Sequence, residues 1–119
     1  MSAAHHGLAN LVCVVDINNQ QADGPSGKIL GFEPLADKWI AFGWFVQRVD
    51  GNDIAAVRAA FDAARHHPQS QPRVILFETL MGSGVPFLEQ REKNHFIRVE
   101  LEEWQQAIAI LDAQQAGDK

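Results

Sequence analysis

Short apolar runs alternate along the chain with stretches whose apolar residues recur every three or four positions. The first run, residues 11–15, is uniformly apolar and partly β-branched, which is typical of a parallel strand covered on both faces. Residues 44–49 predict a second strand, and residues 74–77, again continuous and apolar, predict a third. The apolar and polar pattern therefore predicts three strands separated by helical or irregular segments.

Between and after these runs the apolar period changes to that of helices. A helix with one stripe facing the sheet is predicted from Asp53, its N-cap, to Pro68, where it stops. The stripe consists of Ile54, Val57, Phe61 and Ala64. A shorter helix is predicted from Leu35 to Phe42, with Pro34 at its first turn. A last amphipathic helix, ending before Gly117, carries Leu101, Trp104, Ile108 and Leu111.

Strands that alternate with helices predict right-handed crossovers and a parallel sheet. The expected fold class is α/β, a three-layer Rossmann-like parallel sheet with helices on both faces. Residues 22–31 are rich in Gly, Pro and Ser, so an irregular loop is expected there. Three strands alone leave a narrow sheet with open edges, and we therefore expect this chain to be part of a larger domain.

Composition narrows the classes of partner. The chain has 119 residues, of which 46% are hydrophobic, and one compact domain is the expectation. Its net charge of -5 argues against a nucleic-acid partner. No apolar run approaches the roughly 20 residues that a membrane span needs, so no membrane partner is expected. The single cysteine, Cys13, lies in an apolar run and fits a reducing, cytoplasmic environment.

Candidate chemistry lies in the loops that follow the strands. In open parallel sheets ligands bind outside the carboxyl ends of the strands, so residues 16–24, 50–53 and 79–95 should share one rim. Asp16 and Asn18 would point to the same side of an extended chain, where two oxygen-bearing side chains could face one cation. Taken alone, Asp and Asn after a strand are more often plain turn formers.

Several blocks in this order resemble transketolases. The stretch from Val14 to Pro25 is similar to the second half of the thiamine diphosphate motif in that family, which is a strand, then Asp-x-Asn, then Asp-Gly. The similarity continues through residues 33–39, 41–44, 49–53 and 78–85 and closes at His95. It covers nearly the whole chain. The resemblance implies the thiamine diphosphate-binding fold, with residues 1–119 forming the C-terminal part of the diphosphate-binding domain.

The resemblance also assigns roles to individual residues. Asn18 would be a side-chain ligand of a divalent cation, Mg²⁺ or Ca²⁺, and a neighbour of the diphosphate of thiamine diphosphate. Gln20 would add a backbone carbonyl to the cation. His95 would be the catalytic histidine at the cofactor and substrate. Asp16 is expected to be structural, because in the family pattern the asparagine binds the metal.

The sequence departs from the family pattern at two places. The family motif begins with Gly-Asp-Gly, whose aspartate supplies the carboxylate ligand of the metal, and no such triplet precedes Asp16. We therefore expect the chain to start inside the motif. An aromatic residue and a glycine usually flank the histidine, whereas here Asn94 and Phe96 flank His95.

The implied activity is transfer of a two-carbon ketol unit between ketose and aldose phosphates. The chain would act in a homo- or hetero-oligomer, together with a pyrimidine-binding domain or subunit, and would be inactive alone. Two alternatives stay open at this stage. One is the α subunit of a 2-oxo acid dehydrogenase, which can also carry Asn-Asn and Asp-Gly-Asn-Asp. The other is a non-catalytic truncated fragment or assembly module that keeps the fold.

Overall fold

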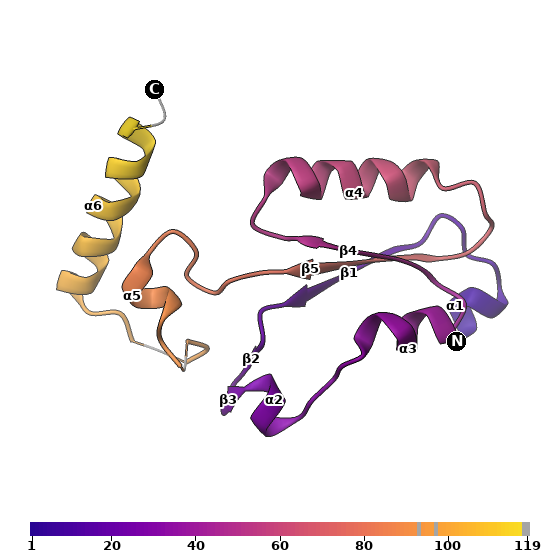
Figure 1. The fold of residues 1–119 in the computed structure, drawn as a ribbon, viewed down its shortest axis with the longest axis horizontal. Helices are drawn as coiled ribbons and strands as arrows, with labels where there is room; N and C mark the ends of the chain where they lie inside the picture. The colour runs from indigo at the N-terminus through magenta and orange to yellow at the C-terminus, as the bar shows by residue number, and fades with distance from the viewer. Residues whose placement is uncertain (93, 97, 118–119) are drawn as a thin grey trace.

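A three-stranded parallel sheet forms the centre of the protein (Figure 1). The computed structural model describes residues 1–92, 94–96 and 98–117. The strands β1 (Val12–Ile17) and β4 (Phe45–Asp50) lie on either side of β5 (Arg73–Glu78), in the order β1-β5-β4. Both outer strands run parallel to β5, and their first residues both pair with Arg73. The predicted α/β class and parallel sheet are confirmed.

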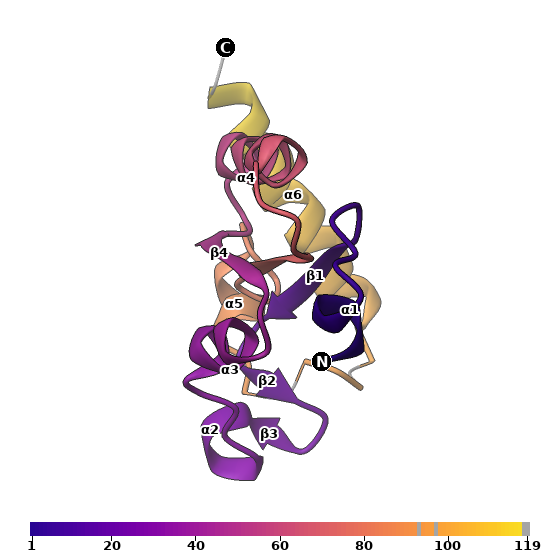
Figure 2. The same cartoon turned by 90° about the vertical axis from the view of Figure 1, so that its right-hand side faces the viewer.

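Helices cover both faces of this sheet. The helix α4 (Ile54–His66) packs on β4 and β5 from one side, and α3 (Leu35–Ala41) packs on β4 from the other (Figures 1 and 2). Three consecutive residues of β5, Val74, Ile75 and Leu76, are completely buried. Their side chains alternate between the two faces, as in any strand. The central strand therefore supplies the core of both layers.

Each face has its own apolar cluster. On the α3 side Val74 and Leu76 pack with Ile17, and partly buried residues of α3 surround them. Trp39 and Trp44 meet edge to face on this side, with ring centroids 4.7 Å apart. On the α4 side Ile75 packs with the alanines of the helix. The three-layer arrangement predicted from the sequence is thus observed.

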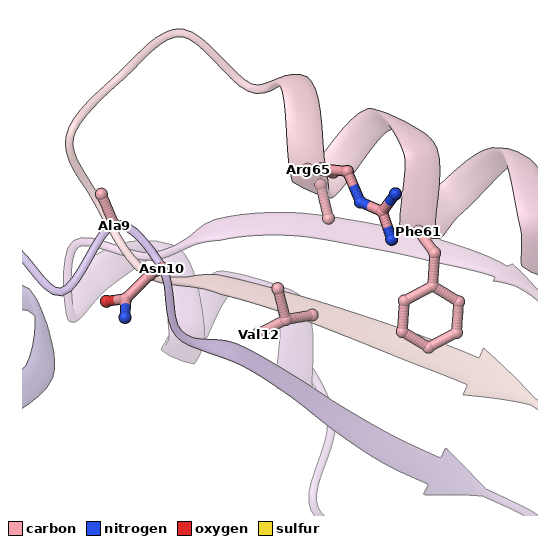
Figure 3. Close-up of a pocket in the computed structure, with 6 residues that line it drawn as sticks. Ala9, Asn10, Val12, Phe61 and Arg65 are labelled. Carbon is pink, nitrogen blue, oxygen red and sulfur yellow. The ribbon is translucent and has the colours of Figure 1, made fainter.

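The first strand is less covered than its apolar sequence predicts. The pattern predicted burial on both faces, but Val12 is 37% exposed and Val14 is 47% exposed. The prediction is wrong because α4 lies over β4 and β5 and leaves β1 uncovered on that side. An open cleft remains between β1 and the second half of α4, with Val12 and Phe61 facing it (Figure 3). Arg65 lies at its rim.

The helix α4 approaches the sheet through small residues. Its N-cap prediction is confirmed, since Asp53 Oδ1 accepts hydrogen bonds from the backbone N–H groups of Ala55 and Ala56 at 2.8 and 3.3 Å. The buried residues are Ala60 and Ala64. The predicted stripe is partly wrong, because Ile54 is 78% exposed. Alanines allow the helix to lie close to the strands, and the ring of Phe61 meets that of Phe77 in β5 with centroids 5.9 Å apart.

The remaining elements are short, except for the last helix. Residues 22–31 are not simply irregular, because they contribute to an antiparallel pair, β2 (Gln20–Gln21) with β3 (Gly24–Pro25), and to a helical turn, α2 (Ser26–Ile29). The helical turns α1 (Ser2–His5) and α5 (Pro86–Glu89) lie near the N-terminus and after β5. The predicted helix at residues 35–42 and all three predicted strands are confirmed within two residues at each end.

The last helix, α6 (Leu101–Gly117), lies away from the sheet and beside α5 (Figure 1). It is helical as predicted, but its apolar stripe does not pack on the sheet. Leu101, Trp104, Ile108 and Leu111 are all exposed, and Ala107 is the buried residue of the helix. Within the described ranges, no helix is both long and apolar enough to cross a membrane.

Truncation of the central strand should destabilise the fold far more than truncation of β1. Leu76→Ala removes a completely buried side chain and should lower the free energy of unfolding by about 2–5 kcal/mol. Val14→Ala, at a position that is 47% exposed, should cost about 1 kcal/mol or less. Urea denaturation monitored by circular dichroism measures both values. Equal losses would contradict the central role of β5.

Candidate diphosphate and cation site

Three loops meet at the carboxyl ends of the strands, as the parallel topology requires. The Thr79 hydroxyl, after β5, donates a short hydrogen bond to the carboxylate of Asp16 in β1. The backbone N–H of Leu80 donates to Asn52 Oδ1, after β4, at 2.8 Å. The shared rim predicted from the sequence is confirmed. An open polar cleft at this rim, about 430 Å³ in volume, is lined in part by Asp50, Asn52, Glu78 and Thr79.

Asp16 joins the first loop to the third. One carboxylate oxygen accepts from the Thr79 hydroxyl, and the other accepts from Asn18 Nδ2 at 3.0 Å. Asp16 and Asn18 therefore point to the same side, as expected. Both Asp16 oxygens thus accept hydrogen bonds within the protein, and the side chain links the loops after β1 and β5. That Asp16 is structural and does not bind the metal stays a prediction.

The chain turns sharply directly after this pair. Asn18 Oδ1 accepts a hydrogen bond from the backbone N–H of Gln20 at 3.0 Å. Between them Asn19 has a φ of 59°, in the left-handed region that asparagine tolerates better than most residues. The carbonyl of Asn19 accepts from the N–H of Ser26 at 2.9 Å, which closes the small β2–β3 unit. Side-chain and backbone bonds thus fix the conformation of the Asn18–Gln20 segment.

His95 reaches this turn from the third loop. Its Nε2 lies 3.2 Å from the carbonyl oxygen of Gln20, although the two residues are 75 positions apart. A carbonyl oxygen can only accept, so the imidazole nitrogen that faces it carries the proton. The imidazole is otherwise exposed. The structure therefore brings Asn18, Gln20 and His95 together, while their roles in binding and catalysis stay predictions.

The oxygens at this turn suit part of a cation site. Asn18 Oδ1 and the Gln20 carbonyl are neutral oxygens of the type that Mg²⁺ and Ca²⁺ bind, and each has a second lone pair beyond its present hydrogen bond. Within the part of the chain that the structure describes, no group of three or more His, Cys, Asp or Glu residues is arranged to hold a metal ion. A bound cation would therefore need anionic ligands in addition to these two.

An ion-pair network flanks the site. Arg48 of β4 lies 2.8 Å from a carboxylate oxygen of Glu33 and 2.8 Å from one of Glu78. The hydrogen bond from Arg48 lowers the pKa of Glu33, and bonds to Glu33 and Glu78 raise the pKa of Arg48. The network ties the loop before α3 to the end of β5. Sequence reasoning missed it because its members are 15 and 30 residues apart and form no local motif.

Comparison with known proteins identifies a family for this fold. Residues 1–114 match the family model described as "Transketolase, thiamine diphosphate binding domain". The chain is 59% identical over 113 residues to an uncharacterized transketolase family protein of Sinorhizobium fredii, covering 95% of this chain and 40% of that protein. It is 36% identical to 6-deoxy-6-sulfo-D-fructose transketolase subunit SqwG of a Clostridium species, covering 98% of this chain and 42% of that protein.

Solved structures agree with this match. A Pichia stipitis transketolase in complex with sedoheptulose-7-phosphate superposes with a TM-score of 0.63 at 28% identity, covering 71% of this chain and 12% of that chain. A Campylobacter jejuni transketolase superposes with a TM-score of 0.64 over 98% of this chain and 22% of its own, at 18% identity, which concerns the fold alone. The chain thus spans about 40% of the length of the curated relatives described above.

Removal of the Asp16 carboxylate should weaken the rim. Asp16→Ala deletes the acceptor of both Thr79 and Asn18, and we expect the free energy of unfolding to fall by about 1–2 kcal/mol. Asp23→Ala is the control, because Asp23 is an exposed carboxylate in the turn between β2 and β3. Chemical denaturation of both variants gives the comparison. Equal stability of the two variants would contradict a linking role for Asp16.

The Glu33–Arg48 pair should give a pH-dependent contribution to stability. Because the folded pKa of Glu33 is lowered, its contribution is present above the ordinary glutamate value of 4.5 and is lost as the pH falls through the folded pKa. Glu33→Gln should therefore reduce the melting temperature near neutral pH, and its difference from the parent should shrink in acid. Glu92→Gln, at another exposed glutamate, is the control. A Glu33→Gln difference that stays constant with pH would contradict this account.

Proposed function

Because the chain belongs to the transketolase family of thiamine diphosphate-binding domains, we propose that it supplies the diphosphate and cation side of a transketolase-type active site. The convergence of Asn18, Gln20 and His95 carries this proposal. These residues come from the loops after β1 and β5, and they meet through hydrogen bonds at the edge of the sheet where ligands of parallel sheets bind. Their chemistry also matches what a hydrated cation and a diphosphate require.

Each of the three residues has a distinct task in this proposal. Asn18 Oδ1 and the Gln20 carbonyl bind Mg²⁺ or Ca²⁺, which holds the diphosphate of thiamine diphosphate. His95 donates a hydrogen bond from its imidazole to the diphosphate or to an oxygen of the substrate. The cofactor, when bound, supplies a carbon nucleophile and an electron sink beside the substrate carbonyl. The protein groups orient the reactants and stabilise charge.

The proposed reaction transfers a two-carbon ketol unit between a ketose phosphate and an aldose phosphate. The chain would act within a homo- or hetero-oligomer in the cytoplasm, where a pyrimidine-binding domain or subunit completes the site. Support for such an assembly comes from relatives named as subunits. One of them is a subunit of the apulose-4-phosphate transketolase of Actinobacillus succinogenes, 36% identical over 80% of this chain and 34% of that protein. The same comparisons favour transketolase over a 2-oxo acid dehydrogenase.

One observation favours a second candidate, a non-catalytic assembly module with the same fold. The carboxylate hydrogen-bonded to Asn18, that of Asp16, is already engaged by Asn18 and Thr79. Two neutral oxygens cannot replace the charge that an anionic ligand gives a cation site. A catalytic assembly would therefore need a further anionic ligand, such as the diphosphate itself or a carboxylate from another part of the protein, whereas a module needs none.

The asparagine at the turn is the first test of the proposed function. In the oligomer that contains this chain, Asn18→Ala should weaken binding of thiamine diphosphate in the presence of Mg²⁺ by at least ~10-fold, because it removes a cation ligand. Asn10→Ala is the matched control, since Asn10 is an exposed asparagine just before β1, at the opposite end of the sheet. Isothermal titration calorimetry measures both affinities. Undiminished affinity of the Asn18→Ala protein would refute the assignment.

Substrate assays then separate the candidate functions. A catalytic assembly should convert ketose and aldose phosphates in the presence of thiamine diphosphate and Mg²⁺, and His95→Ala should reduce its kcat/KM by ~10²-fold or more, within the range for a positioned proton donor. His66→Ala, at the exposed end of α4, should leave the rate unchanged. Cofactor-dependent turnover of 2-oxo acids would support the dehydrogenase instead. Failure of the oligomer to bind the cofactor at all would support the module.

A further inference from the structure

Gln20 engages all four of its hydrogen-bonding groups at once. Its backbone N–H donates to Asn18 and its carbonyl faces His95, at 3.0 and 3.2 Å. Its side chain reaches in the same direction as the carbonyl, toward the loop after α5. The Nε2 group donates to the carbonyl of Arg91 at 3.2 Å, and Oε1 accepts from the N–H of Asn94 at 3.3 Å. The residue therefore contacts both the turn after β1 and the loop that carries His95.

The two side-chain bonds require an amide group. A donor must face the Arg91 carbonyl and an acceptor must face the Asn94 N–H, and a glutamine side chain offers both from one planar group. The side chain is half-buried between the two loops. The family pattern uses only the backbone carbonyl at this position, so the side chain contributes something that the resemblance does not assign.

The loop that carries His95 depends on polar contacts. Asn94 Nδ2 donates to the Leu88 carbonyl at 2.8 Å, and Arg91 forms an ion pair with Glu103 of α6. Neighbouring Phe96 is 88% exposed and contributes no apolar anchor. Because the contacts of the described residues in this part of the loop are hydrogen bonds and an ion pair, these contacts position the imidazole. The Gln20 bonds are the described contacts that join this loop directly to the Asn18 turn.

We propose that the side chain of Gln20 has a positioning role: it holds Arg91 and Asn94 and thereby keeps His95 at a fixed distance from Asn18. The backbone and the side chain of Gln20 then position both parts of the site, the Asn18 turn and the loop that carries His95. This proposal concerns the geometry of the chain itself. Its consequence for catalysis rests on the proposed function, in which Asn18 and His95 act on the same cofactor.

The next residue provides a matched control. Gln21 belongs to the same two-residue strand β2, but its Nε2 donates to the Leu30 carbonyl at 2.9 Å, away from the His95 loop. Gln20→Leu and Gln21→Leu each remove one amide at similar volume. Gln20→Glu keeps an acceptor for the Asn94 N–H and places a second oxygen against the Arg91 carbonyl, so it tests the donor separately.

Nuclear magnetic resonance of the 119-residue chain gives two readouts. Hydrogen exchange of the Asn94 amide should accelerate by ~10-fold in Gln20→Leu, because its acceptor is lost, and remain at the parent rate in Gln21→Leu. Gln20→Glu should accelerate the exchange of the Asn94 amide less, because it keeps an acceptor for this amide. The ¹⁵N shifts of His95 should report the Nε2-protonated tautomer in the parent and in Gln21→Leu, and a mixture of tautomers in Gln20→Leu. Thermal unfolding confirms that each variant is folded before these comparisons.

Unchanged Asn94 exchange and His95 tautomer in folded Gln20→Leu would overturn the proposal, as would equal changes in Gln21→Leu. Should Gln20→Leu fail to fold, Gln20→Glu decides on the same two readouts.

A double variant tests action through His95 in the cofactor-binding oligomer. The loss of kcat/KM in the Gln20→Leu/His95→Ala double variant should be smaller than the combined losses of the two single variants, because both substitutions act through the imidazole. A double-variant loss equal to the combined single-variant losses would overturn the claim that the Gln20 side chain acts through His95. If the resonance changes occur but His95→Ala leaves catalysis intact, the positioning stands and the proposed function fails.

Discussion

The parallel alignment of three strands around β5 is the constraint on which the rest of the structure depends. Because β1, β4 and β5 run in the same direction and in register, their carboxyl ends reach the same edge, and three loops distant in sequence must meet there. Complete burial of Val74, Ile75 and Leu76 holds this alignment from both faces. The candidate site therefore depends on the core, because the loops after β1 and β5 that form it are aligned only as long as these two strands stay paired.

The sequence predicts most of this framework because the framework rests on short-range signals. Apolar runs, the Asp53 cap and the stop at Pro68 locate the strands and α4 within a few residues. The coverage of β1 could not be predicted in this way, since an apolar strand has the same composition whether or not a helix lies over it. Only the position of α4, set by the close fit of Ala60 and Ala64 against Ile75, reveals that Val12 faces an open cleft and that Val14 is exposed.

The candidate site was predictable to the extent that a family motif names its residues. The resemblance identifies Asn18, Gln20 and His95 as candidates, but it does not predict their mutual contacts. A hydrogen bond between residues 75 positions apart produces no periodic pattern in the sequence. The same reason explains why the Gln20 side chain and the Arg48 network were missed. At such positions the residue type allows many partners, and only the tertiary arrangement selects one.

Charge explains why a cation is central to the proposed function. A diphosphate carries several negative charges, and the chain itself has a net charge of -5. The ionisable group hydrogen-bonded to Asn18 is the Asp16 carboxylate, which repels an anion. Neutral oxygens at Asn18 and Gln20 cannot compensate for that repulsion, but they can bind Mg²⁺ or Ca²⁺, which reverses the local field. In the proposed function the diphosphate would therefore bind this edge of the sheet together with the cation, and the hydrogen-bonded turn would hold Asn18 and Gln20 in place for both.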